Sequence, residues 1–229
     1  VLIKPVADTA TTTVTAHVRG NEDEVMPLSI RPSSSDPSET FNVTISAIPD
    51  GAILVYDGVA LTADATGLPP GFTIVSSGDS WSLSIDGFDP DLGAGMTIQT
   101  PEDSNEPFTL TVDTVSVDTL DVPGDPGSPY VSESSAYSLD ILISPKGVAD
   151  EAQLTIVDPA DQTFEESTVD ANGGVALNQL ITSAALTDDD GSEVLSFRVS
   201  NLPEGFSLQG GTLIGDGVWS LTEAQLQTA

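Results

Sequence analysis

Acidic residues that lie close together in the second half of the sequence could bind a metal ion. Asp188, Asp190 and Glu193 belong to the run Asp-Asp-Asp-Gly-Ser-Glu. Calcium takes about six to eight oxygen ligands, and carboxylates at this spacing on an extended loop can converge on it. The spacing is not that of an EF-hand, whose bidentate glutamate stands at the end of a longer loop. Consecutive aspartates repel one another unless a cation or solvent screens them, so we expect calcium here in preference to the alternative, a solvated acidic turn.

The overall charge excludes several classes of function. The 229 residues include 36 Asp and Glu but only 5 Lys and Arg, which gives a formal net charge of -31. Binding to nucleic acid or to an anionic membrane needs clusters of basic residues, whereas the five here are dispersed along the sequence. With no cysteine and a single histidine, His17, the chain has no means of forming disulfides, thiolate sites or His-rich zinc sites. Hydrophobic residues still make up 38% of the chain, in runs too short to span a membrane, so we expect a packed core.

Alternation of apolar and polar residues predicts an all-β fold. Short alternating runs are separated by Pro- and Gly-rich turn signals such as Leu68-Pro69-Pro70-Gly71, a spacing typical of β-sandwiches. The predicted strands include residues 41–45, 72–75, 81–85, 108–112 and 195–199.

The chain also contains an internal repeat, which predicts two domains. The segment Lys4–Ala10 returns as Lys146–Ala152, and Trp81-Ser82-Leu83 returns as Trp219-Ser220-Leu221. We expect a first β-sandwich over residues 1–145, with an insertion near 54–77 in a loop or added hairpin, and a second over 146–229. Three later strands of the first copy have no counterpart in the second. We therefore expect the second copy to be truncated, and to be completed by residues of a longer protein or paired by another molecule.

Several of these motifs together resemble the tandem extender repeats of giant bacterial RTX adhesins. They are Gly-Asn-Glu-Asp at 20–23, the acidic run at 188–193, the Leu-Pro-x-Gly turn, and Gly-Asp-Gly-x-Trp-Ser-Leu-Thr-x-x-Gln-Leu at 215–226. The resemblance covers essentially the whole chain. It implies calcium-dependent Ig-like or cadherin-like β-sandwiches, secreted or on the cell surface, that carry distal binding domains in adhesion and biofilm formation. The implied partners are calcium ions, neighbouring repeats, and a glycan or protein ligand for the parent adhesin.

The resemblance also implies a wider set of calcium ligands, drawn from acids at strand starts and in the linkers. A metal shared between a linker aspartate and loops of the following domain would hold adjacent sandwiches at a fixed angle. The first copy departs from the pattern, because Ser34 and Ser35 replace two of the three consecutive acids. For Asp150, a solvated linker residue remains an equal alternative. The candidate ligands are Asp8, Glu22, Asp23, Asp36 and Glu39 in the first copy and Asp150, Glu165, Glu166, Asp188, Asp190 and Glu193 in the second.

Two rival functions remain. The insertion around Tyr56-Asp57-Gly58 and 68–72 could form a sugar- or protein-binding rim, because loops on a rigid scaffold are where such sites arise. Paired carboxylates could also catalyse glycoside hydrolysis, but nothing in the sequence marks an acid–base pair, so we do not expect an enzyme.

A weaker candidate calcium loop contains Asp86, Asp89 and Asp91.

Overall fold

The computed structural model describes residues 3–157, 176–187, 191–202, 204 and 207–226. It divides into two compact units, unit 1 (Val1–Val148) and unit 2 (Ala149–Ala229). This division lies three residues beyond the boundary expected from the sequence repeat. Almost all of the regular structure is β, as the alternation predicts, and the β-sandwich class is confirmed.

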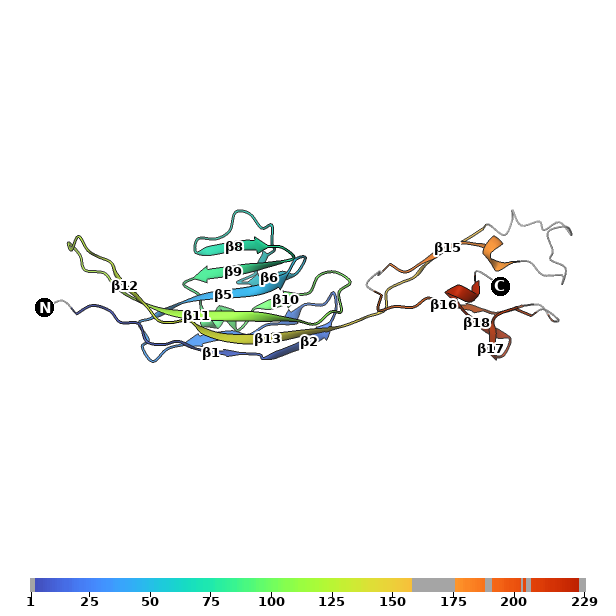
Figure 1. The fold of residues 1–229 in the computed structure, drawn as a ribbon, viewed down its shortest axis with the longest axis horizontal. Helices are drawn as coiled ribbons and strands as arrows, with labels where there is room; N and C mark the ends of the chain where they lie inside the picture. The colour runs from blue at the N-terminus through green and yellow to red at the C-terminus, as the bar shows by residue number, and fades with distance from the viewer. Residues whose placement is uncertain (1–2, 158–175, 188–190, 203, 205–206, 227–229) are drawn as a thin grey trace. The chain divides into compact units, whose positions relative to one another are not determined.

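Unit 1 is built from β-sheets packed around one core (Figure 1). A seven-stranded sheet has the order β2-β13-β11-β5-β9-β8, with β12 paired to β11. A four-stranded sheet has the order β3-β10-β6-β7, and β1 pairs with β4. The strands are β1 (Thr11–Val14), β2 (His17–Asn21), β3 (Met26–Pro27), β4 (Ile30–Ser33), β5 (Thr40–Pro49), β6 (Ile53–Tyr56), β7 (Val59–Leu61), β8 (Phe72–Ser77), β9 (Ser80–Asp86), β10 (Thr97–Gln99), β11 (Phe108–Leu120), β12 (Tyr130–Glu133) and β13 (Tyr137–Lys146); the helix α1 spans Pro90–Gly93.

The core of unit 1 follows from the alternation. Every second residue of β5, β9 and the first part of β11 is buried, because successive side chains of a strand point to opposite faces of the sheet. Trp81 on β9 is 1% exposed, and its indole N–H donates to the carbonyl of Pro49 at 3.1 Å. It is therefore a core residue, as expected. A bulge in β5, where Ala47 takes a left-handed φ of 59°, keeps the residues on both sides of it facing inward.

Two pairings in unit 1 position the ends of its chain. The first strand of the large sheet, β2, runs parallel to the last, β13, with His17 opposite Leu142 and Asn21 opposite Lys146. At the C-terminal end of β11, residues Val117–Leu120 pair with β12. The two strands form a hairpin that continues past the body of the sandwich (Figure 1). The segment before β1 lies along this hairpin, where the N–H of Val6 donates to Asp118 and that of Ala7 donates to Ser132.

Unit 2 repeats the central part of this architecture. Its three-stranded sheet has the order β16-β18-β17, the counterpart of β5-β9-β8. Trp219 pairs with Val199 much as Trp81 pairs with Ile48. No strand in the described part of unit 2 pairs with the second edge of β16, which corresponds to the edge of β5 that β11 occupies. The elements are β14 (Gln153–Ile156), η3 (Leu177–Gln179), β15 (Ile181–Ala185), β16 (Ser196–Val199), β17 (Thr212–Gly215), β18 (Val218–Thr222) and α2 (Glu223–Leu226), with β14 paired to β15.

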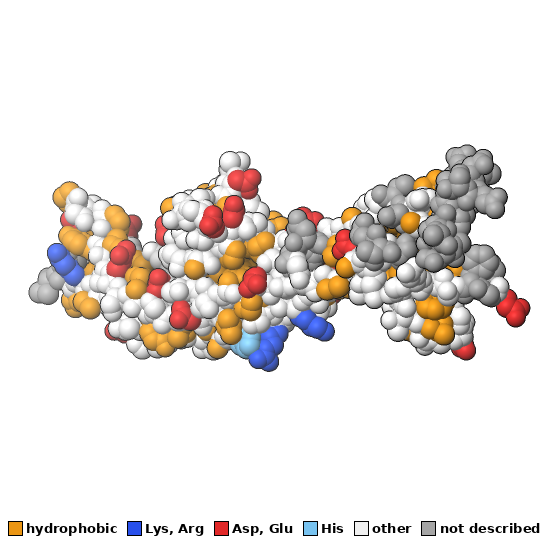
Figure 2. Space-filling view, turned by 45° about the vertical axis from the view of Figure 1, so that its right-hand side comes forward, with side chains coloured by type: hydrophobic (Ala, Val, Ile, Leu, Met, Phe, Trp, Pro, Cys, Tyr) orange, Lys and Arg blue, Asp and Glu red, His pale blue; other side chains and the backbone are white. Residues whose placement is uncertain are grey.

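The surface of unit 1 reflects the composition. Acidic side chains are spread over the face shown in Figure 2, and His17 receives a hydrogen bond from Arg19 at 3.2 Å. No helix in the described ranges has the length and apolar character needed to cross a membrane.

Candidate functional site at the linker residues

A glutamate holds the backbone of the opening segment in each unit. In unit 1 the N–H of Asp8 donates to Glu39 Oε1 at 2.5 Å, and in unit 2 the N–H of Asp150 donates to Glu193 Oε1 at 2.6 Å. The sequence repeat pairs Asp8 with Asp150 and Glu39 with Glu193, so the same charge-assisted contact is made twice. The Asp8–Glu39 contact and its surroundings are called the first linker site below, and the Asp150–Glu193 contact the second linker site.

Serine hydroxyls complete the first linker site. The Ser34 hydroxyl donates to Glu39 Oε2, the oxygen that Asp8 leaves free. The Ser35 hydroxyl donates to the carboxylate of Asp8 at 2.6 Å, and the Ser116 hydroxyl donates to the Asp8 carbonyl. Glu39 is only 7% exposed, so these bonds replace the water that its carboxylate loses on burial. Both oxygens of Glu39 are therefore satisfied by the protein itself.

Asp36, a predicted ligand of the same loop, has its own partner. Its Oδ1 accepts the hydroxyl of Ser38 at 2.7 Å and the N–H of Ser38 at 2.8 Å. These two hydrogen bonds, the one from the hydroxyl having the larger effect, lower the pKa of Asp36 below its usual value. These contacts close the loop before β5 as an aspartate turn.

One carboxylate oxygen of the second linker site differs from its counterpart in the first. Glu193 Oε2 is buried and has no hydrogen-bond partner there, while Asp150 is exposed. A buried carboxylate oxygen without a partner is costly, and a cation or a water molecule would relieve that cost. The predicted ligands Asp188, Asp190, Glu165 and Glu166 lie outside the described residues.

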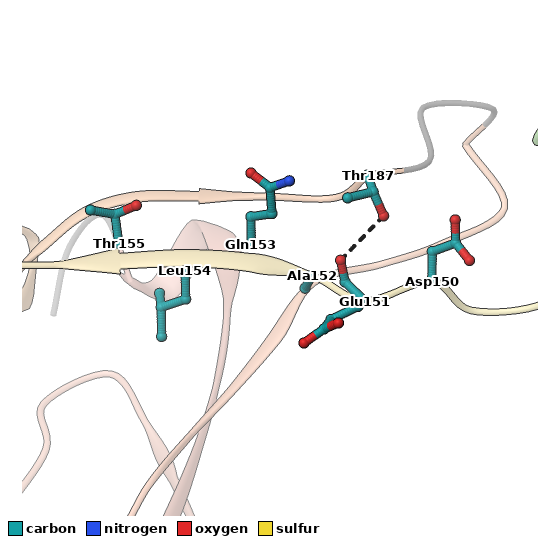
Figure 3. A pocket seen from close by; sticks show the side chains of 7 residues that line it. All are labelled: Asp150, Glu151, Ala152, Gln153, Leu154, Thr155 and Thr187. Atoms are coloured by element: carbon teal, nitrogen blue, oxygen red, sulfur yellow. Dashed lines mark hydrogen bonds between the residues drawn. The ribbon is translucent and has the colours of Figure 1, made fainter.

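An open hollow of about 830 Å³ adjoins the second linker site (Figure 3). It lies within unit 2, at the start of β14, and the Thr187 hydroxyl donates to the Glu151 carbonyl across it at 3.2 Å. Asp150 and Glu151 give one end of the hollow an acidic character. Its lining residues are Asp150, Glu151, Ala152, Gln153, Leu154, Thr155 and Thr187.

Glu22 is the most deeply buried acid in the described part of the chain. It follows β2, is 2% exposed, and its Oε1 accepts the N–H of Val148 at the end of unit 1. Its backbone N–H also donates to the Lys146 carbonyl at 3.0 Å, so Glu22 extends the pairing of β2 with β13. Among the described residues its Oε2 has no hydrogen-bond partner. Glu22 therefore fixes the backbone at the end of unit 1. Its second carboxylate oxygen remains available to accept a further hydrogen bond or to bind a cation.

The remaining predicted ligand of unit 1, Asp23, does not join these acids. Its side chain accepts the N–H of Asp103 at 3.2 Å, and its carbonyl accepts the Gln99 amide. Within the described ranges no three His, Asp or Glu residues form a group able to hold a metal ion. Of the ligands predicted for unit 1, the structure joins Asp8 to Glu39 and leaves Glu22, Asp23 and Asp36 with separate partners.

Sequence reasoning missed the serines of the first linker site. In the sequence, Ser34 and Ser35 stand out only as replacements for two of the three consecutive acids, and Ser116 lies far away on β11. The signal in the sequence is the alignment of the two copies. Two acidic residues of the second copy, which only accept hydrogen bonds, align with Ser34 and Ser35 of the first copy, whose hydroxyls donate to Glu39 and Asp8.

Tyr56 of the insertion and Asp89 of the second candidate loop have structural roles. Tyr56 is 4% exposed, and its hydroxyl accepts the N–H of Asp89 at 2.8 Å, so Tyr56 itself is a core residue and not part of a binding rim, whereas Asp57 and Gly58 beside it are exposed. Asp89 caps α1 by accepting the N–H groups of Asp91 and Leu92. The insertion itself contains the hairpin of β6 and β7.

The sequence matches no protein-family model, and it matches no curated protein. The solved structures that show similarity to it include the following three. The N-terminal domain of the Streptococcus gordonii adhesin Sgo0707 is 10% identical over 62% of this chain and 34% of its own, with a TM-score of 0.25. The Actinomyces fimbrial adhesin FimA is 13% identical over 93% of this chain and 95% of its own, with a TM-score of 0.27. A marsupial T cell receptor is 9% identical over 96% of this chain and 85% of its own, with a TM-score of 0.22.

Two of these three structures are bacterial adhesins. This chain spans about a third of the length of the Sgo0707 domain. TM-scores this low establish no common fold.

Proposed function

We propose that this chain is a calcium-stabilised extender region of a secreted or cell-surface bacterial adhesin, which stiffens the polypeptide and projects distal binding domains. The second linker site carries this proposal. There Glu193 binds the linker backbone through one oxygen, while its other oxygen is buried without a partner among the described residues. The resemblance to extender repeats and the net charge of -31 support the same function.

Asp150, Asp188, Asp190 and Glu193 are the residues that would hold the ion. Calcium is a hard cation that prefers carboxylate and carbonyl oxygens, which are the donors that this part of the sequence offers. When bound, it supplies the positive charge that these neighbouring carboxylates lack. This chain's own residues orient the ligands, because the N–H of Asp150 fixes one oxygen of Glu193.

The proposed effect on the linker is electrostatic. The N–H groups of Val148 and Asp150 are bound by carboxylates, Glu22 within unit 1 and Glu193 within unit 2. Without a cation, repulsion among the acids weakens this hold, and with calcium the repulsion is removed. Calcium would therefore restrict the backbone of residues 147–151.

A calcium titration tests the proposal. Calorimetric titration of the chain with calcium is expected to show binding, and thermal melting is expected to show stabilisation. An ion that binds only the folded state adds about 2.7 kcal/mol at a hundredfold excess over its Kd. The triple variant Asp188→Asn, Asp190→Asn, Glu193→Gln is expected to lose at least one bound ion.

A matched control keeps the change in net charge the same. Glu204→Gln, Asp216→Asn and Glu223→Gln together remove three charges from the same unit, away from the linker site in the sequence, and are expected to leave calcium binding intact. If both triple variants behave alike, only general charge screening is at work. Scattering curves with identical dimensions in calcium and in chelator would falsify the stiffening role.

A further inference from the structure

We propose that Arg19 on β2 is a binding site for the carboxylate of an acidic sugar, with His17 holding its guanidinium in place and Lys146 supplying a second positive charge. The site lies in unit 1 and uses none of the residues assigned to calcium, so it does not depend on the proposed function. These residues are far apart in the sequence, and the fold brings them together.

The pairing of β2 with β13 places the three side chains on one face of the seven-stranded sheet. In the parallel register Arg19 lies opposite Ser144, two residues before Lys146. Val18, between His17 and Arg19, is buried, so its two neighbours point to the outer face. His17, Arg19 and Lys146 are all exposed, and strand spacing puts the Cα atoms of Arg19 and Lys146 about 8 Å apart. Figure 2 shows the single pale blue histidine beside blue basic side chains.

Hydrogen bonds orient the guanidinium of Arg19. Its Nε–H donates to Nε2 of His17 at 3.2 Å, and Ser144 Oγ lies 2.9 Å from the same nitrogen. Because a guanidinium only donates, Nε2 is an acceptor here, so the Ser144 hydroxyl also donates to it and the imidazole is neutral. The two terminal nitrogens of Arg19 have no partner among the described residues. They remain to donate in the planar fork that matches a carboxylate.

No described carboxylate neutralises the two cations. Neither Arg19 nor Lys146 forms an ion pair within the described ranges, although the chain has 36 acids to 5 basic residues. Asp140, on the same face of β13, lies four residues before Ser144 and accepts the Thr111 hydroxyl at 3.0 Å. An external anion would therefore meet two positive charges that no described acid balances.

The surroundings favour an anion with a single charge on an uncharged body. A net charge of -31 repels polyanions, whereas one carboxylate is attracted locally by Arg19 and Lys146. Leu142, which lies opposite His17 and is 37% exposed, adds an apolar surface beside the imidazole. A uronic acid fits this arrangement, because its ring presents C–H groups to the apolar surface and its carboxylate to the guanidinium. The side chain of a peptide glutamate offers the carboxylate without the ring.

NMR titration of the intact chain with a matched pair of sugars tests the proposal. Methyl β-D-glucuronide carries the carboxylate, and methyl β-D-glucoside has the same ring without the charge. The Nε–H signal of Arg19 is expected to shift saturably with the glucuronide and to stay in place with the glucoside. An equal response to both sugars, or a response to neither, would overturn the proposal. Equally tight binding of acetyl-Gly-Glu-Gly-amide, a peptide with one carboxylate, would overturn the assignment to a sugar.

Substitutions of arginine separate the fork from the charge, with binding followed through the backbone amides of β2 and β13. Arg19→Gln is expected to abolish saturable binding of the glucuronide. Arg19→Lys is expected to raise its Kd about tenfold, because lysine keeps the charge but loses the fork. Lys146→Gln is expected to raise the Kd about threefold, as for an exposed charge.

Arg31→Gln is the matched control, because Arg31 is an exposed arginine on another strand of unit 1, opposite Thr13. It removes the same charge as Arg19→Gln and is expected to leave binding unchanged. An equal loss in both variants would mean general attraction between charges and would contradict a site at Arg19.

His17 is a positioning residue, so its test includes the exchange of the proton that it holds. His17→Ala is expected to accelerate hydrogen exchange of the Arg19 Nε–H and to raise the Kd of the glucuronide about fivefold. His17→Gln, which keeps a side-chain acceptor, is expected to restore most of both. Amides of β11 report that unit 1 stays folded. Unchanged exchange and binding in His17→Ala would show that the histidine does not orient Arg19.

The titrations also distinguish this site from the proposed function. They are made in buffer freed of calcium by a chelating resin, since soluble carboxylate chelators would compete, and are repeated with calcium. If the chain binds the glucuronide but no calcium, the proposed function fails and the sugar site stands. If it binds calcium but not the glucuronide, the sugar site is wrong and the proposed function stands.

Discussion

Several carboxylates in the described part of the chain accept backbone N–H groups. Asp36 and Asp125 each accept an N–H two residues further on, a contact that favours the ionised form. Glu39 and Glu193 accept N–H groups from residues far away in the sequence. An excess of acids therefore contributes to local structure as well as to surface charge.

The Asp125 turn gives a prediction at this scale. The Gly127 N–H, and after it the Tyr130 hydroxyl, lower the pKa of Asp125. Tyr130→Phe removes the hydroxyl, so the pKa of Asp125 is expected to rise toward its ordinary value, as measured by NMR titration of the side-chain carboxyl. A lowered pKa in the folded state stabilises that state above the unfolded pKa, and this contribution is lost as the pH falls through the folded pKa. Asp36, held by Ser38, is the control and is expected to titrate unchanged.

At the scale of the elements, local pattern predicted strands but not their partners. The runs at 41–45, 81–85 and 108–112 lie within β5, β9 and β11, because alternation is a property of the strand itself. The parallel pairing of β2 with β13 and the length of β11 were not predictable, since they depend on residues far apart in the sequence. The same holds for the site. The acids near the linkers can be recognised in the sequence from their residue type. Ser116 cannot, because only the fold brings its hydroxyl to the Asp8 carbonyl.

Tryptophan recurs at matching positions of β9 and β18, which gives a prediction about the two sheets. Trp81 is 1% exposed and makes a hydrogen bond to Pro49, whereas Trp219 is only half-buried within the described part of unit 2. Trp81→Ala is expected to lower the free energy of unfolding of unit 1 by about 3–5 kcal/mol, the cost typical of removing a large aromatic side chain from a core. Trp219→Ala is expected to cost unit 2 less. Urea denaturation followed by circular dichroism measures both, and equal losses would show that Trp219 is packed as tightly as Trp81.

At the scale of the whole molecule, the two units differ in the core that they bury. The core cluster of unit 1 contains 23 buried hydrophobic residues, whereas in the described part of unit 2 only Leu221 and Leu226 are buried hydrophobics. Leu154, Ile156 and Leu213 of unit 2 are each more than half exposed. Since burial of apolar surface is the main stabilising contribution to folding, the units are expected to differ in stability and to unfold separately.

The two tryptophans allow this difference to be measured in one chain, because each unit contains one. Trp81→Phe leaves Trp219 as the fluorescent reporter of unit 2, and Trp219→Phe leaves Trp81 as the reporter of unit 1. In chelator, the transition reported by Trp219 is expected at a lower urea concentration than the one reported by Trp81. In calcium, the Trp219 transition is expected to move upward while the Trp81 transition stays within error, because the cation would act at the second linker site. Coincident transitions in both conditions would mean that the two units unfold together and that their stabilities are coupled through the linker.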